Sequence, residues 1–134
     1  WNEQDQAKLE LDKEKNVYFL GYKKYREAPM YIQQFDIGII PHKGDNLTAS
    51  MNPMKMYEYL ACGKPVVSTK NTGSDNLKDM VAIAKDYEDF NKKINKALEN
   101  NSKEEVEKRK EFVKQYSWFK AVQKMLELIN KKLN

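Results

Sequence analysis

Residues 52–67 read NPMKMYEYLACGKPVV and contain the signals for a helix followed directly by a strand. Asn52 is a preferred N-cap residue, and Pro53 suits the first helical position, where no amide hydrogen bond is lost. Gly63 suits the residue that follows a helix, because glycine adopts the left-handed conformation without strain. The apolar run at 65–68 then begins at once. The stretch predicts a helix that begins at Asn52, ends at Gly63 and leads into a buried strand.

Four short apolar runs, rich in β-branched residues, are spaced along the first two-thirds of the chain. They are continuous rather than alternating, which is typical of strands covered on both faces of a parallel sheet. Helical stretches separate them, including one before Asp36 with Pro29 in its first turn. We therefore expect an α/β fold, a Rossmann-like parallel sheet of about four strands with helices on both faces. The four predicted strands are VYFL (17–20), IGII (37–40), PVVS (65–68) and VAIA (81–84).

The last third of the chain is predicted to be entirely helical. A helix over 87–100 is followed by Ser102 with Glu105 three residues on, the spacing of a capping box. A final helix from Ser117 places its apolar residues on one stripe, so it forms a helical C-terminal tail. No repeat or flexible linker interrupts the chain, and we expect residues 1–134 to form a single domain.

The strand order adds one expectation. In the common doubly wound order 3-2-1-4-5-6, strand 3 is separated from strand 4 by the first two strands. If 17–20 is strand 3 and 37–40 is strand 4, the strands that lie between them are not in this sequence. We therefore expect an incomplete domain.

Composition excludes several classes of function. The 24 basic and 20 acidic residues are intermixed and leave a net charge of only +4, which indicates a solvated surface rather than a nucleic-acid interface. One cysteine and one histidine cannot form an internal disulfide or a Cys/His metal site, and we expect no metal and no cofactor. The lone Cys62 fits a reducing cytoplasm.

Lys55 is the unusual residue of the helix start. A cation in the first turn opposes the helix dipole, at a cost of a few tenths of a kcal/mol, roughly. A bound anion would reverse that effect, and free amides with a lysine beside them make a phosphate-type site. The alternative is that Lys55 points into solvent or pairs with Glu58 three residues on.

The position of this helix supports a ligand site. Ligands of open α/β sheets bind beyond the carboxyl ends of the strands, and a long polar loop that includes His42, Lys43 and Ser50 follows the strand at 37–40. His42 could act as a base or a donor, although a lone loop histidine usually does neither. A carboxylate one turn into the helix, Glu58, suits a sugar diol because it can accept two hydrogen bonds.

With these residues identified, the chain resembles the C-terminal half of bacterial glycosyltransferases of the GT-B fold. The resemblance runs from about Asn16 to the last helix, through NVYFLG, FDIGIIP, NPMKMYEYLACGKPVV and a late SW. It implies an incomplete GT-B C-terminal domain that binds a nucleotide-sugar donor, UDP-linked as a family expectation. It also implies a glycan or lipid-linked acceptor held by a separate N-terminal domain.

The resemblance assigns roles to particular residues. It places Glu58 on the donor ribose and the backbone amides around Asn52, Pro53 and Met54 near the diphosphate, while a direct phosphate contact from Lys55 is our own inference. Many retaining members carry a second glutamate eight positions earlier, near the transferred sugar, where this chain has Ser50. The stereochemical outcome therefore does not follow from the sequence.

The function expected from the resemblance is that of a hexosyltransferase-type enzyme of envelope or capsule polysaccharide synthesis. We expect it to be cytoplasmic and peripheral at the inner membrane face, and the fragment alone to be inactive. Exposed apolar surface on the last helix predicts self-association. Alternatives are a sugar-nucleotide epimerase, which needs more carboxylates at the sugar, and a non-catalytic α/β interaction module.

Overall fold

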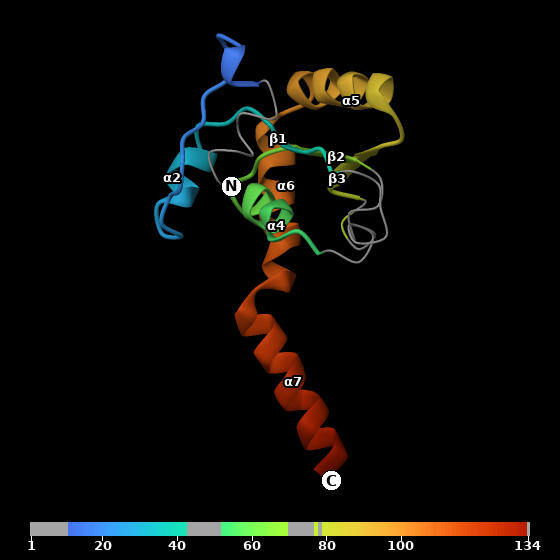
Figure 1. Ribbon diagram of the computed structural model, residues 1–134. Helices are drawn as coiled ribbons and strands as arrows, with labels where there is room; N and C mark the ends of the chain where they lie inside the picture. The colour runs from blue at the N-terminus through green and yellow to red at the C-terminus, as the bar shows by residue number, and fades with distance from the viewer. Residues whose placement is uncertain (1–10, 43–51, 70–76, 78, 134) are drawn as a thin grey trace.

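The computed structural model describes residues 11–42, 52–69, 77 and 79–133. From α2 to β2 helices and strands alternate, β3 is the next described element, and helices alone follow it (Figure 1). The elements are η1 (Leu11–Lys13), α2 (Ala28–Ile32), β1 (Gly38–Ile40), α4 (Met54–Ala61), β2 (Val66–Thr69), β3 (Val81–Ala84), α5 (Tyr87–Glu99), α6 (Lys103–Val113), η3 (Lys114–Tyr116) and α7 (Trp118–Leu133).

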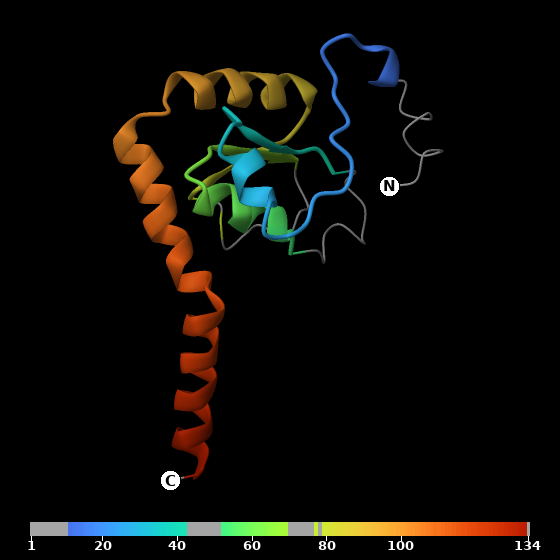
Figure 2. The same ribbon diagram turned by 90° about the vertical axis from the view of Figure 1, so that its left-hand side faces the viewer.

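The described strands form one parallel sheet in the order β1-β2-β3. Gly38 is the register partner of Val66, which in turn is the partner of Val81. Helix α5 lies over one face of the sheet and α4 over the other, with α2 beside α4 (Figures 1 and 2). The prediction of an α/β fold with a parallel sheet and helices on both faces is confirmed, and three of the four predicted strands are present.

The predicted strand at 17–20 is wrong. These residues form no strand, and Tyr18 and Leu20 are 79% and 50% exposed. A strand is stabilised by hydrogen bonds to a neighbour, and in the order 3-2-1-4-5-6 this segment pairs with strand 2 rather than with strand 4. The described part of the chain offers no such neighbour, so an apolar run of β-rich composition stays extended and unpaired.

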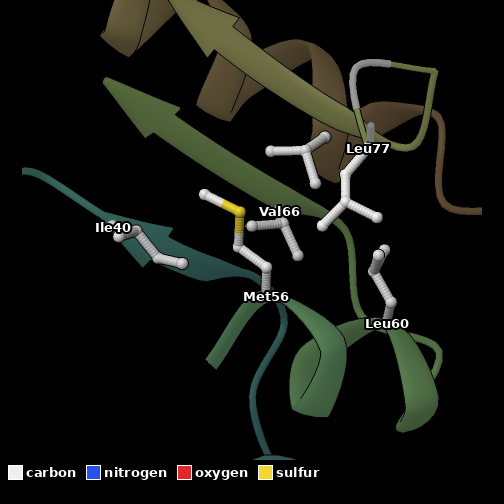
Figure 3. Packing of buried hydrophobic residues seen from close by; sticks show 6 residues of the cluster. Ile40, Met56, Leu60, Val66 and Leu77 are labelled. Atoms are coloured by element: carbon white, nitrogen blue, oxygen red, sulfur yellow. The ribbon is translucent and has the colours of Figure 1, made fainter. Parts of the chain in front are cut away.

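The core lies between the sheet and α4. Met56 and Leu60 are fully buried on the inner side of the helix and pack against Ile40, Val66 and Leu77 (Figure 3). Their spacing of four residues places both on one helical face, so the sequence of α4 determines which side it buries.

A buried arginine fixes the turn between α4 and β2. Gly63 follows the helix with φ +73° and accepts a hydrogen bond at its carbonyl oxygen from Arg109 Nε, 2.9 Å away. Arg109 is 6% exposed and also donates to Asn101 Oδ1. Burial lowers the pKa of Arg109, and Glu105 partly opposes that effect. The guanidinium therefore anchors α6 to the end of α4, and the predicted glycine position after the helix is confirmed.

Helix α7 extends away from the sheet (Figures 1 and 2). Its large apolar side chains are exposed, from Leu133 at 80% to Val122 at 48%, which confirms the expected exposed apolar surface. Self-association through that surface stays a prediction. Among the described residues no helix has the length and apolar character needed to cross a membrane.

Candidate functional site

The start of α4 differs from the prediction in its capping. Pro53, in extended conformation, occupies the N-cap position, and no side chain caps the helix. Asn52 was predicted to be the cap, but its Oδ1 accepts a hydrogen bond of 2.9 Å from the hydroxyl of Tyr57 instead. Met56 N donates to Pro53 O at 3.0 Å. The amides of Met54 and Lys55 thus begin the helix without a side-chain acceptor, as an anion-binding helix start requires.

Tyr57 is itself held by the C-terminal part of the chain. The centroid of its ring lies 5.2 Å from the ring centroid of Tyr116 in η3, which in turn lies 5.7 Å from the ring centroid of Phe112 in α6. These aromatic contacts fix the orientation of the Tyr57 hydroxyl that holds Asn52. The absence of a side-chain cap at the start of α4 therefore depends partly on residues far along the sequence.

Lys55 and Glu58 both lie on α4 close to its start. Lys55 is exposed and Glu58 is partly buried, and no ion pair joins them within the described part of the chain. The sequence left two alternatives to a phosphate role for Lys55, pairing with Glu58 or exposure to solvent. The structure shows no such pair, and the Lys55 side chain is exposed to solvent. The pKa of the neighbouring Tyr59 is raised, mainly by burial and secondly by the negative charge of Glu58.

His42 lies at the carboxyl end of β1, partly buried. Its backbone oxygen accepts a hydrogen bond of 2.7 Å from Thr69 Oγ1 at the end of β2, which ties the two strand ends together. This is the edge of a parallel sheet where ligands bind. Two other predicted site residues, Lys43 and Ser50, lie outside the described residues.

A cleft of about 380 Å³ between α2 and α4 was not foreseen from the sequence. Glu58 and Cys62 line it from the α4 side, Tyr25 and Arg26 line it from the turn before α2, and Gln33 lines it from the residue that follows α2. The cleft exists because α2 packs against α4. No spacing of residues along the chain signals such packing, so Tyr25, Arg26 and Gln33 carried no sequence signal as site residues.

Metal binding finds no support in the part of the chain that the structure describes, where no group of three His, Cys, Asp or Glu side chains could hold an ion.

Loss of the hydrogen bond between Asn52 and Tyr57 should destabilise the protein measurably. Asn52→Ala and Tyr57→Phe should each lower the free energy of unfolding by about 1 kcal/mol, and the double variant by no more than either, because all three lose the same bond. Urea denaturation of the four proteins measures this. Ser102→Ala is the control for the loss of a true helix cap. The Ser102 hydroxyl oxygen accepts a hydrogen bond of 3.2 Å from Glu105 N at the start of α6. Equal costs of Asn52→Ala with and without Tyr57→Phe would contradict the assignment.

A parallel sheet with helices on both faces, and a helix start near the carboxyl edge, defines the Rossmann-like class of α/β proteins. Within that class, the family model described as glycosyl transferases group 1 matches residues 2–100. The chain belongs to this family.

One relative is similar over a shorter region. It is the putative teichuronic acid biosynthesis glycosyltransferase TuaH of Bacillus subtilis (strain 168), 43% identical over 54 residues. The matched region is 40% of this chain and 14% of that protein, so the chain corresponds to a small part of the relative. No solved structure matches.

Proposed function

We propose that this chain binds the nucleotide diphosphate sugar donor of a glycosyl transfer reaction at the start of α4. The observation that carries the proposal is the start of α4, which no side chain caps and which has Lys55 in its first turn. The carboxylate of Glu58 lies one turn further on and makes no ion pair within the described residues. Membership of the glycosyl transferases group 1 family supports the same reading.

The chemistry follows from the charges at this helix start. Breaking the bond between a sugar and a diphosphate builds negative charge on the leaving phosphate oxygens. The amides of Met54 and Lys55, the positive end of the helix dipole and the Lys55 ammonium can stabilise that charge. Glu58 can accept hydrogen bonds from the two ribose hydroxyls, which orients the donor along the helix.

The finer assignments rest on the family and on the partial relative. We propose a uridine nucleotide as the donor carrier, a hexosyl group as the transferred sugar, and a glycan or lipid-linked acceptor bound outside this chain. The relative's printed role in teichuronic acid biosynthesis supports a function in envelope polysaccharide synthesis. We propose that the reaction takes place at the cytoplasmic face of the membrane.

Calorimetric titration with UDP tests the proposal. Lys55→Ala and Glu58→Ala should each weaken binding by about tenfold or more, because each removes a hydrogen bond to a charged group. Lys124→Ala and Glu127→Ala on the exposed α7 are matched controls and should leave the affinity unchanged. Absence of UDP binding at millimolar concentration, or equal affinity in all five proteins, would overturn the proposal.

A further inference from the structure

We infer that α7 binds an anionic lipid surface, with its apolar face in the outer part of the bilayer and its lysines against the lipid headgroups. The choice of the cytoplasmic side rests on the proposed function, whereas the lipid surface itself follows from the residues of α7.

Helix α7 carries its apolar side chains outside the body of the molecule. In both views it leaves the sheet as a rod, and the element that it contacts most is η3 at its base (Figures 1 and 2). An exposed apolar face of this length marks a site that binds a protein or a membrane. The six side chains that form its centre are all at least 48% exposed: Trp118, Val122, Met125, Leu126, Ile129 and Leu133.

The width of this apolar face favours a lipid surface over a second helix. At about 3.6 residues per turn, the six side chains lie on one side of α7, with Leu128 and Phe119 at the two edges. The face therefore covers about half of the helix circumference. One partner helix covers only a narrower seam, as in a coiled coil. A helix that lies in a bilayer surface buries the whole apolar half.

The charges of α7 complement anionic headgroups. The helix contains four lysines and one glutamate, and none of them makes an ion pair within the described residues. Lys120, Lys124 and Lys131 lie together on the polar half, toward the edge marked by Leu128, whereas Glu127 lies opposite Ile129. Lys132 lies within the apolar half in the last turn, where its long stem can reach the headgroups. Lysines near an anionic membrane add electrostatic attraction to the burial of the apolar face.

The base of α7 lies next to the proposed donor site. Tyr116, which comes just before the helix, contacts the ring of Tyr57, and the hydroxyl of Tyr57 holds Asn52 at the start of α4. Trp118 is the first residue of α7, and tryptophan favours the boundary between lipid and water. A membrane that holds α7 therefore brings the start of α4 close to lipid-linked molecules.

Co-sedimentation of the whole chain with lipid vesicles tests the inference. The chain should bind vesicles of equal parts phosphatidylglycerol and phosphatidylcholine at least ~10-fold more tightly than vesicles of phosphatidylcholine alone. Ile129→Glu should weaken binding by ~30-fold or more, because it removes a buried isoleucine and places a charge in the lipid. Gln123→Glu is the matched control, since it adds the same charge on the polar half, and should cost about fivefold at most.

The lysines and Trp118 give two further readouts. Replacing Lys120, Lys124 and Lys131 together by glutamine should remove most of the preference for anionic vesicles. The chain has two tryptophans, so Trp1→Phe leaves Trp118 as the only one. Anionic vesicles should then shift the Trp118 fluorescence to shorter wavelength and protect it from quenching by iodide. Adding Ile129→Glu should abolish both effects.

Loss of folding does not explain the expected result. Ile129 is 53% exposed, so Ile129→Glu should leave stability in urea unchanged. Absence of binding to anionic vesicles, or equal loss in Ile129→Glu and Gln123→Glu, would overturn the inference. If the chain binds no vesicles but sediments as a dimer that Ile129→Glu dissociates, the apolar face belongs to a second copy instead.

The donor site is tested separately from the membrane surface. Ile129→Glu should bind UDP with the affinity of the wild-type chain, because α7 contributes no residue to the start of α4. A chain that binds vesicles but not UDP would overturn the proposed function alone. A chain that binds UDP but no vesicles would overturn the membrane inference alone.

Discussion

Gly38→Ala should lower the free energy of unfolding by about 3 kcal/mol, the upper part of the usual range for overpacking a core. A Cβ at this position of β1 would lie 2.3 Å from Cδ2 and 2.6 Å from Cγ of Tyr59. These are the ring atoms closest to the backbone, so a small rotation of the side chain cannot relieve the clash. The ring also lies edge-on to Phe35 with centroids 6.3 Å apart. Urea denaturation followed by circular dichroism measures the effect.

Two further variants show whether the clash is the cause. Gly21→Ala is a matched control, because Gly21 has φ +66° and nothing within 4 Å of its would-be Cβ, so it should cost only about 1 kcal/mol of backbone strain. In a Tyr59→Ala background the ring is absent, and Gly38→Ala should then cost little. An equal cost of Gly38→Ala in both backgrounds would show that the backbone rather than the ring requires glycine.

Met56→Ala should cost about 3 kcal/mol, within the range measured for truncating fully buried side chains. Met56 is 0% exposed and packs between α4 and the sheet, so the shorter side chain leaves a cavity in the centre of the core (Figure 3). Met54→Ala is the matched control on the same helix. Met54 is 59% exposed, and its replacement should change stability by less than about 0.5 kcal/mol.

The two methionines also differ in their relation to the proposed site. Met56 holds the first turn of α4 against the sheet, and that turn carries the amides proposed to meet the diphosphate. We expect Met56→Ala to weaken UDP binding as well as stability, and Met54→Ala to affect neither strongly. Similar costs of unfolding for the two methionines would contradict the core assignment.

Local signals in the sequence predicted much of the fold. The apolar runs at 37–40, 65–68 and 81–84 are strands, and Ser102 caps α6. Gly63 follows α4 with positive φ. Each of these features depends on neighbouring residues, through burial on both faces of a strand, a hydroxyl next to free amides, or the absence of a Cβ. Lys55 and Glu58 were proposed as site residues from their spacing within one helix, and their role stays a prediction.

Tertiary structure decided the rest. The run at 17–20 has strand composition, but a strand needs a hydrogen-bonded neighbour, which no local pattern supplies. Asn52 has the chemistry of a cap, yet it accepts from Tyr57, whose ring is oriented by Tyr116 from a distant part of the chain. The cleft that contains Arg26 exists only because α2 packs on α4. Sequence determined which elements form, because their signals are short-range, whereas pairing, side-chain orientation and clefts arise from contacts between residues far apart in the chain.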